Sequence, residues 1–535
     1  MQVRSLELYC KVWGFLKYYH PQVTSGRYNW DLLFVAHYDA AKRASTPQEI
    51  NAVLKALLQE ADHSQEPVKF LTSFTVRGKV SPITSFDWIN DTSLGAELRS
   101  SLRALVDGPL PAQQRYIHRT KNHILDDFTN DSAWFSDNFF PAEPVRMLAL
   151  SRYWNIIEYF YPFKAELSWD TVLTHYIPET LSKKDTAYHL MMVELATRIR
   201  DGRGTGGSWI TKNIWGAKEF PIDVRTIEGK MMICGTIFYL VPNGDSLLAA
   251  CGLQRGDVIT KINGIDVTVV RKYYSNYIGY SNPATFERAI NYQMLRGNKS
   301  DSVVLEILRD GQYIHSVVRY VDERKALTLY KPYLTVEPWK ILDSTIGYIQ
   351  IEKMDTATVK SALERLLATE ALVIDLRGIA TSSNRGMINY LADELSPMII
   401  TAPLVDKPGY LEIRDAPEQR IKWGKEKRYT GKIVLLVNDH TLGGLEYTAV
   451  IYQAVPGVKT FGSQTVGSSG GVVDIFLPGK IVSRMTSYGI YYPDGTPTQR
   501  VGVKIDYEVH PTIAGIRAGK DEILERALEY IKTGK

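Results

Sequence analysis

Cysteine is scarce in this sequence of 535 residues, which contains only Cys10, Cys234 and Cys251. The spacing of the three matches no metal-ligand motif, and an odd number cannot pair completely into disulfides. Cys234 and Cys251 could pair with each other, although the role of a small buried apolar residue suits each of them better. The cysteines therefore predict neither a metal site nor a disulfide framework, and nothing else in the sequence implies an organic cofactor.

Long hydrophobic runs and a strong net charge are absent as well. No apolar run approaches the roughly 20 residues of a membrane-spanning helix, so no membrane span is expected. The formal net charge is +4, which is small for this length and gives no indication of nucleic acid binding. The N-terminal residues MQVRSLELYCKVW lack the plan of a signal peptide. The sequence thus predicts a soluble protein, and its length predicts three or four domains.

A repeat occupies the N-terminal part of the chain. WGFLKYYHP, 13–21, matches WNIIEYFYP, 154–162, and a Trp-Asp pair follows each copy, at 30–31 and 169–170. Both copies continue into segments whose apolar residues recur at helical spacing, and a proline ends the first helix of each. The pattern predicts two helical units. We expect their aromatic residues to pack the helices together rather than to bind a ligand.

A compact β module is predicted next along the chain. GLQRGDVITKINGIDV, 252–267, contains a strand pattern that ends at the dipeptide Asn263-Gly264, which favours a tight hairpin turn. VVLEILRDGQYIHSVV, 303–318, predicts a second hairpin around Asp310-Gly311. Between the two, ATFERAINYQMLRG has the spacing of an amphipathic helix.

The last part of the chain alternates strand and helix patterns. Such alternation predicts an α/β layer with parallel strands. The predicted strands are GYIQI (347–351), ALVIDL (371–376), KIVLLV (432–437) and VKTFG (458–462).

The order of these parts resembles the C-terminal-processing, or tail-specific, serine peptidases and the related tricorn core protease. The similarity covers roughly residues 146–535 and rests on GLQRGDVITKING, ALVIDLRG, IVLLVN followed by Glu446, and YYPDGTPTQRVGVKIDYEV. It implies peptide-bond hydrolysis by a serine-type peptidase, and a periplasmic or secreted location with the signal peptide absent from this sequence. It also implies a multidomain α+β fold. The predicted domains are an N-terminal helical repeat with an irregular segment (1–145), a second helical repeat (146–217), a PDZ-like domain (218–322) and a crotonase-like α/β core (323–535).

The resemblance also implies a peptide ligand. PDZ domains bind a peptide, usually a C-terminus, as an added strand. By resemblance, the segment 230–240 would be the receiving strand, with Met232, Ile233, Gly235 and Ile237 as substrate-binding residues. The expected partner is a peptide or protein C-terminus. The alternative is an internal scaffold that only orients its neighbours, and the sequence does not predict an oligomeric state.

The catalytic positions of the family lack their usual side chains here. The family's nucleophile is a serine three residues before a helix-opening glutamate, and this position is Gly443. The general-base lysine of the tail-specific branch aligns with Ser468, and the histidine of the tricorn-like D-x-H element aligns with Arg203. A serine hydroxyl is a poor nucleophile without a base within hydrogen-bond reach. The loop after DLR also departs from the family, which leaves the backbone at Gly378 and Gly444 as candidate oxyanion donors.

These substitutions predict a peptidase fold that binds peptides without cleaving them. The alternative is an active serine peptidase with a relocated nucleophile on the loop 467–471, in which Ser469 attacks and His440 is the base. Adjacent Asp439 and His440 side chains would point apart if the strand continued, which disfavours that arrangement. A third hypothesis is a scaffold that uses its tyrosine-rich repeats for recognition. An open cleft beside Gly443 would favour the first two hypotheses over the third.

Overall fold

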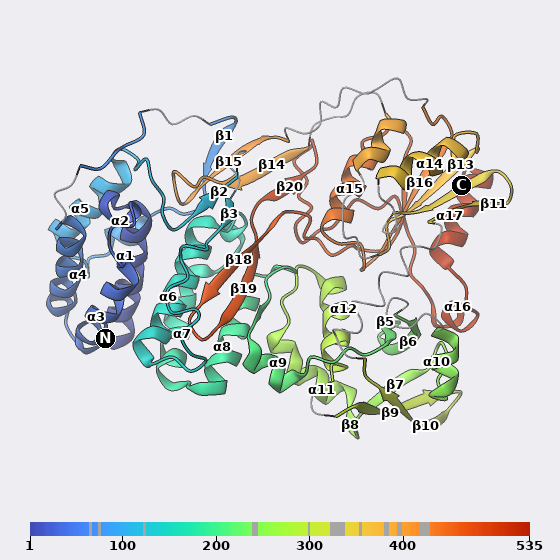
Figure 1. Cartoon of the computed structure of the whole chain (residues 1–535), viewed down its shortest axis with the longest axis horizontal. Coiled ribbons are helices and arrows are strands. Elements are labelled where there is room, and N and C mark those ends of the chain that lie inside the picture. The colour runs from blue at the N-terminus through green and yellow to red at the C-terminus, as the bar shows by residue number, and fades with distance from the viewer. Residues whose placement is uncertain are drawn as a thin grey trace. The chain divides into compact units, whose positions relative to one another are not determined.

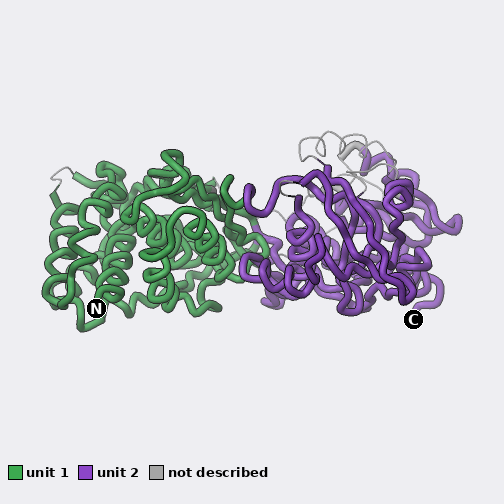
Figure 2. Tube along the Cα trace, turned by 90° about the horizontal axis from the view of Figure 1, so that it is seen from below, with its two compact units in different colours: residues 1–211, 399–415, 471–489 green, residues 212–398, 416–470, 490–535 purple. Residues whose placement is uncertain are grey.

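The structure is a computed structural model (Figure 1), and the chain in it divides into two compact units (Figure 2). Unit 1 comprises residues 1–211, 399–415 and 471–489, and unit 2 comprises 212–398, 416–470 and 490–535. Each unit therefore joins segments that lie far apart in the sequence. The structure describes residues 1–63, 67–72, 76–120, 125–237, 244–297, 300–321, 338–351, 356–378, 385–392, 398–416 and 428–535.

The predicted repeat forms two helix groups in unit 1, each held by a pair of tryptophans. Trp13 Nε1 donates to the Trp30 carbonyl at 3.1 Å, and Trp30 Nε1 donates back to the Trp13 carbonyl at 3.0 Å. Trp154 and Trp169 exchange the same two hydrogen bonds, at 3.2 and 3.1 Å. All four indoles are buried, so these aromatic residues do pack the helices. The groups comprise α1 (Gln2–Tyr19), α3 (Trp30–Arg43) and α4 (Pro47–Asp62), and α6 (Glu143–Phe160), α7 (Val172–Ser182) and α8 (Asp185–Thr197).

The first helices of the two groups meet at equivalent positions of the repeat. Asn155 occupies the space beside its counterpart Gly14, where an added Cβ would lie 1.9 Å from the Asn155 side chain. Asn155 Nδ2 also donates to the Cys10 carbonyl at 3.0 Å, and Ser151, the counterpart of Cys10, contacts the same carbonyl at 3.4 Å. Because equivalent residues touch each other, the two groups are related by an approximate two-fold axis.

A buried charge cluster lies between these helix groups. Lys17 Nζ lies 2.8 Å from Asp31 and 2.5 Å from Asp131, and Arg152 lies 2.9 Å from each carboxylate. Burial alone would raise the pKa of Asp31, but Lys17 and Arg152 together hold it below its ordinary value. The cluster is neutral as a whole, which is the condition for burying four charges at tolerable cost.

Unit 1 is completed by strands from the C-terminal half of the chain. Two antiparallel groups of strands form in this way. The first joins β1 (Lys79–Pro82), β15 (Tyr410–Asp415) and β14 (Ile399–Pro403), and the second joins β18 (Val472–Leu477), β19 (Ile481–Thr486) and β4 (Gly206–Gly207).

The β module of unit 2 has the two hairpins expected from the sequence. Asn263 and Gly264 have φ of 50° and 79°, and Asp310 and Gly311 have 46° and 83°, as a two-residue turn with both central residues at positive φ requires. The sheet order is β10-β9-β7-β6-β5, with β8 paired to β7. Its strands are β5 (Ile222–Ile227), β6 (Lys230–Thr236), β7 (Val258–Ile262), β8 (Ile265–Asp266), β9 (Ser302–Arg309) and β10 (Gln312–Arg319).

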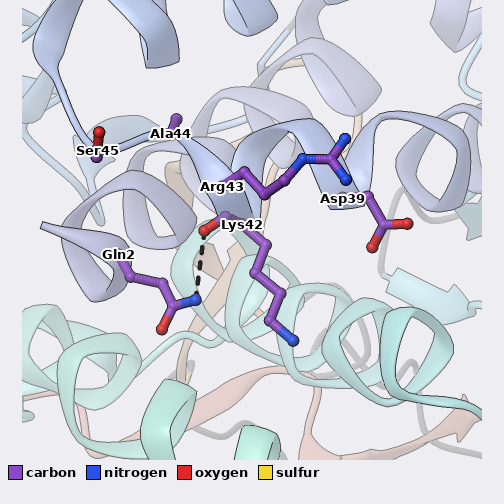
Figure 3. A pocket seen from close by; sticks show the side chains of 6 residues that line it. All are labelled: Gln2, Asp39, Lys42, Arg43, Ala44 and Ser45. Carbon is purple, nitrogen blue, oxygen red and sulfur yellow. Dashed lines mark hydrogen bonds between the residues drawn. The ribbon is translucent and has the colours of Figure 1, made fainter.

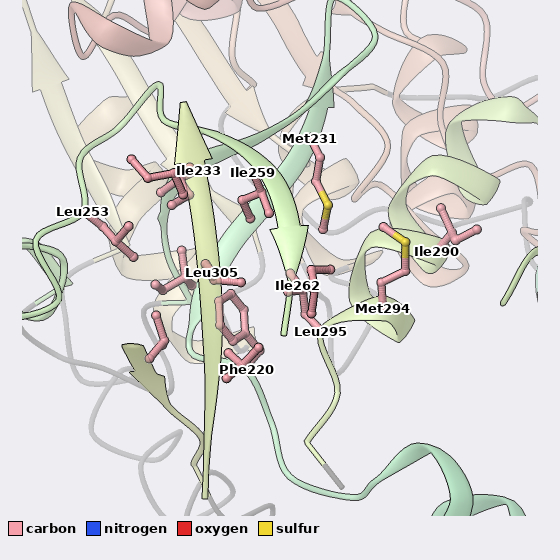
Figure 4. Packing of buried hydrophobic residues seen from close by; sticks show 14 of the residues in the cluster. Phe220, Met231, Ile233, Leu253, Ile259, Ile262, Ile290, Met294, Leu295 and Leu305 are labelled. Carbon is pink, nitrogen blue, oxygen red and sulfur yellow. The ribbon is translucent and has the colours of Figure 1, made fainter. Parts of the chain in front are cut away.

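One hydrophobic core joins this sheet to its helices (Figure 4). Ile233, Ile259 and Leu305 from the strands pack with Ile290 and Met294 from a helix. This packing buries one face of the sheet and holds that helix alongside β5. The helices of the module are α10 (Gly244–Ala250), α11 (Val267–Tyr274) and α12 (Pro283–Met294).

The α/β layer predicted from the sequence forms the rest of unit 2. Its sheet has the order β11-β12-β13-β16-β17-β21, and all pairs except β11–β12 are parallel. The strands are β11 (Trp339–Leu342), β12 (Ile346–Gln350), β13 (Ala371–Asp375), β16 (Lys432–Val437), β17 (Lys459–Gly462) and β21 (Tyr507–Glu508). The helices are α14 (Thr356–Leu366), α15 (Gly444–Gln453) and α17 (Glu522–Thr533). The mixed α+β, multidomain architecture expected from the sequence is thus confirmed.

A short helix near the C-terminus, α16 (Ile513–Arg517), connects this layer to the β module. Ile513 and Ile516 pack against Ile227 and Met232, in a cluster separate from the module's main core. The Ile513 N–H donates to Glu228 Oε1 at 3.1 Å. Because α17 follows directly and packs on the parallel sheet, residues 513–533 hold the β module and the α/β layer together.

Three findings bear on the absences noted in the sequence. All three cysteines are free. In the part of the chain that the structure describes, no helix is both long and apolar enough to cross a membrane. Within the same residues, no group of three or more His, Cys, Asp or Glu side chains could hold a metal ion.

Candidate functional site

The candidate site centres on the turn between β16 and α15, residues 438–443, which we call the nucleophile turn. The buried strand β16 ends at Val437, and Thr441 anchors the turn that follows. Thr441 Oγ1 donates to the carbonyl of Leu376, just after β13, at 2.9 Å, and accepts the Asn438 N–H at 3.1 Å. The His440 N–H donates to Asn438 Oδ1 at 2.9 Å. Side-chain hydrogen bonds of this kind produce a tight and reproducible turn.

Gly443 has the backbone of a nucleophile turn without a side chain to attack. Its φ is 53° and its ψ is −108°, a conformation that glycine adopts readily and that strains other residues. A sharp, strained strand-to-helix turn is the arrangement that exposes a serine nucleophile in several hydrolases. Gly444 is the first residue of α15, where backbone N–H groups lack intrahelical acceptors.

Glu446 joins this turn to the loop that follows β17. Its carboxylate is fully buried. It accepts hydrogen bonds from the Gly467 N–H at 2.6 Å, the Ser468 N–H at 2.9 Å and Thr465 Oγ1 at 2.6 Å. A longer hydrogen bond, at 3.3 Å, comes from the Gly443 N–H. Burial raises the pKa of Glu446 although these donors oppose the shift. Glu446 therefore holds the turn and this loop together.

Both serines on this loop are buried. Ser468, at the position of the lysine, is fully buried, and its backbone N–H is bound to Glu446. Ser469 Oγ is hydrogen-bonded to Thr498 Oγ1, which itself donates to the Ile490 carbonyl at 2.8 Å. Because the Thr498 hydroxyl proton is used there, Ser469 must donate its own proton to Thr498.

His440 lies in a different, charged environment that includes strand β5. Burial lowers the pKa of His440, Arg225 and Arg288 lower it further, and Asp439 and Asp223 oppose the shift. Arg225 Nε donates to Asp223 Oδ2 at 3.0 Å. Ser469 Oγ is bound to Thr498, and the charges that act on His440 come from Asp439 and from groups that include Asp223 and Arg225, so these contacts do not join the two residues as a nucleophile and its base.

Arg203 belongs to unit 1, where the aspartate of its D-x-H-like element has a structural role. Asp201 is fully buried and accepts the Arg203 N–H and the Thr486 N–H, each at 2.9 Å. The turn 201–203 is thereby attached to β19. The position of the histidine is occupied by a partly exposed arginine.

The sheet order places the predicted peptide-binding residues of β6 in the interior of the sheet. Met232, Ile233 and Gly235 lie on β6, which is paired with β5 on one side and β7 on the other. An interior strand has its backbone groups engaged and cannot receive a further strand, whereas an edge strand can. Ile237 lies just beyond β6, and its N–H donates to the Pro221 carbonyl. The strand at the edge next to β6 is β5, and β10 is at the other edge of the sheet.

The sequence interpretation missed Asp223 and Arg225 on that edge strand. In IDVRTI the apolar Ile222 and Val224 alternate with these two charged residues. Alternation is the signal of a half-buried strand whose other face is polar. Gly378 follows β13 as expected, while the run 379–382 of the proposed oxyanion loop lies outside the described residues.

A separate surface pocket of about 460 Å³ lies in unit 1 (Figure 3). Gln2 Nε2 donates to the Lys42 carbonyl across it at 3.3 Å. Lys42 itself forms an ion pair with Glu143. Ser45 Oγ donates to Glu49 Oε2 at 2.9 Å, so the serine and the lysine of the pocket each have another partner, and the pocket does not compete with the nucleophile turn as a candidate site. Its lining residues are Gln2, Asp39, Lys42, Arg43, Ala44 and Ser45.

Comparisons with known proteins agree with the fold. The model of peptidase family S41 matches residues 345–509, which confirms the resemblance to C-terminal-processing peptidases. The structure of mature CPAF complexed with lactacystin has a TM-score of 0.55 and 13% identity, over 74% of this chain and 99% of that one. Mature CPAF alone has a TM-score of 0.53 and 13% identity, and the match covers 73% of this chain and 96% of that one. At such identity the similarity shows a shared fold. No curated protein with a similar sequence was found.

Proposed function

Because the model of peptidase family S41 matches residues 345–509, we propose that this protein binds peptides or protein C-termini at a peptidase site that does not hydrolyse them. The observation that carries the proposal is Gly443, which has a nucleophile-turn backbone and no side chain. Nucleophilic catalysis requires an attacking atom and a base that activates it. The turn has no attacking atom at Gly443. Ser468 replaces the lysine that would supply the base.

The β module supports a peptide ligand, and we interpret it as a PDZ-like domain beside a crotonase-like core. Strand β5 is at the edge of its sheet, and α12 packs alongside it. A groove between an edge strand and a helix is where such domains accept a peptide as an additional strand. The electrostatic interactions of Asp223 and Arg225 with His440 support a path for the bound peptide from β5 toward the nucleophile turn.

A peptide that binds between β5 and α12 would meet direct hydrogen bonds that join these two elements. Thr226 Oγ1 donates to Glu287 Oε2 at 2.7 Å and accepts from Asn291 Nδ2 at 2.9 Å. Arg271 also forms an ion pair with Glu287. A peptide strand that enters here has to displace these contacts, so we expect modest affinity and a dependence on the Thr226 side chain.

The test is a binding and cleavage assay on one substrate. A fluorescent, unstructured peptide with an apolar C-terminus is expected to bind without being cut, and its C-terminally amidated form is expected to bind less tightly. The Ser468→Ala/Ser469→Ala double variant should bind equally well. Turnover that is present in the natural chain and lost in the double variant would identify an active serine peptidase with a relocated nucleophile, and the proposal would be wrong. Binding that is absent for both peptides would favour the scaffold hypothesis.

The same resemblance leads us to propose a periplasmic or secreted location. Fractionation of the source cells tests it directly. Recovery of the protein only with cytoplasmic markers would contradict it.

A further inference from the structure

A serine and a histidine that play no part in the proposed peptide site form a hydrogen-bonded pair in unit 1. Ser208 follows strand β4 and precedes helix α9 (Trp209–Trp215), and His189 lies on α8. Ser208 Oγ lies 2.8 Å from His189 Nδ1. A nucleophile within hydrogen-bond reach of a base, with the base oriented by a third group, is the arrangement that activates a serine.

The third group is a backbone carbonyl. His189 Nε2 lies 2.7 Å from the carbonyl oxygen of Phe139, which can only accept a hydrogen bond, so Nε2 carries a proton. Burial lowers the pKa of His189, although the Phe139 carbonyl opposes the shift, and the ring is therefore neutral near pH 7. Nδ1 then has no proton, and it accepts the hydrogen bond from the Ser208 hydroxyl. This is the tautomer that a general base requires.

The pair itself is buried, with His189 0% and Ser208 8% exposed, and two exposed aromatic side chains lie next to it. Phe140 is 50% exposed and Trp209, next to Ser208, is 59% exposed. The Phe140 ring meets His189 edge-on at 5.9 Å between centroids, and the Phe139 and Trp209 rings lie 5.6 Å apart. These rings form an apolar surface beside the pair. Their chemistry suits an apolar or aromatic acyl group.

We propose that Ser208 and His189 form a second reactive site, which transfers an apolar or aromatic acyl group from an ester to water. Ser208 Oγ bonds to the ester carbonyl carbon while its proton moves to His189 Nδ1. The carbon–oxygen bond to the alcohol then breaks, and Nδ1 returns the proton to the departing oxygen. Water attacks the acyl-serine with the same proton transfers, which releases the acid and restores Ser208. The overall reaction consumes one ester and one water and yields one acid and one alcohol.

Ser208 also caps α9, and the test has to separate that structural role from reactivity. The Thr211 N–H lies 3.3 Å from Ser208 Oγ, and the Ser208 N–H donates to Thr211 Oγ1 at 2.9 Å. Asparagine caps a helix about as well as serine, whereas alanine does not. Ser208→Asn therefore removes the nucleophile and keeps the cap, and Ser208→Ala removes both.

The experiment uses the full chain with a fluorophosphonate probe and 4-nitrophenyl hexanoate. We expect labelling at Ser208, and hydrolysis that Ser208→Asn and Ser208→Ala both abolish, with only Ser208→Ala lowering the melting temperature. His189→Gln can keep both hydrogen bonds but cannot act as the base, and it should slow hydrolysis by about 100-fold or more. Ser182→Ala, an exposed serine on α7, is the matched control and should change nothing.

Two results would overturn the proposal. One is the absence of labelling and hydrolysis in the natural chain, which would leave Ser208 as a helix cap alone. The other is labelling that persists in Ser208→Asn. The outcome is separate from that of the peptide assay, because labelling at Ser469 would identify a relocated peptidase site instead.

Discussion

Replacing Gly443 by serine tests whether a side chain is all that the nucleophile turn lacks. At φ 53° and ψ −108°, a residue with a Cβ is strained by about 1–3 kcal/mol. We therefore expect Gly443→Ser and Gly443→Ala to lower the free energy of unfolding by similar amounts in that range. Gly457→Ala is the control for positive φ in open space, since its φ is 82° and an added Cβ would meet no atom within 4 Å. Urea unfolding followed by tryptophan fluorescence measures all three.

Peptide cleavage by the same variants is the decisive measurement. Ser468 stands at the position of the lysine, and Ser469 donates to Thr498, so a serine at 443 would have no base from this loop. A positioned base contributes roughly 100- to 10,000-fold to the rate. We expect Gly443→Ser to cleave no faster than Gly443→Ala. Cleavage by Gly443→Ser that is 100-fold faster or more would refute this reasoning, because it would show that a base is already in place.

Three further predictions follow from buried contacts. Lys17→Met should destabilise unit 1 by about 3–5 kcal/mol in a denaturation assay, because it leaves a buried carboxylate uncompensated. The control is Lys55→Met, which breaks an exposed pair with Glu97 and should cost less than about 1 kcal/mol in the same assay. The pKa of Glu446 is raised in the folded chain. The contribution of Glu446 to the free energy of unfolding is therefore complete below its unfolded pKa of about 4.3, and it is lost as the pH rises through the pKa of the folded chain. Denaturation at several pH values should show that loss, and it should be smaller in Glu446→Gln; an equal loss in both would contradict the assignment. Ile516→Asp should release the β module from α16 and speed amide hydrogen exchange in β6, and unchanged exchange would show that α16 does not hold the module.

The sequence predicted the elements of the fold well because their signals are local. Buried parallel strands are continuous apolar runs, and Asn-Gly and Asp-Gly pairs favour turns with positive φ at both positions. The repeat was visible because its tryptophans recur with fixed neighbours. The two compact units were harder to foresee, since strands from 399–415 and 471–489 join helices more than 200 residues away. Such pairing depends on long-range packing, which no local pattern records.

The candidate site was predictable only in part, for a related reason. The position of Gly443 follows from a strand, a turn and a helix-opening glutamate that adjoin in the sequence. The choice of β5 over β6 as the edge depends on which strand lies beside β7, and this is set by packing across the module. The pair Ser208–His189 escaped notice because the two residues lie on different elements and share no motif.

The persistence of Glu446 beside a glycine nucleophile position has a physical explanation. A catalytic serine contributes little to folding, so its loss leaves the scaffold intact. Glu446 instead accepts the N–H groups of Gly467 and Ser468, and without it these buried donors would be unsatisfied at about 1–3 kcal/mol each. If cleavage has been lost as proposed, selection for a stable fold alone would retain Glu446 and the shape of the turn. A turn that is kept for stability continues to present backbone donors, which is the property that peptide binding without hydrolysis requires.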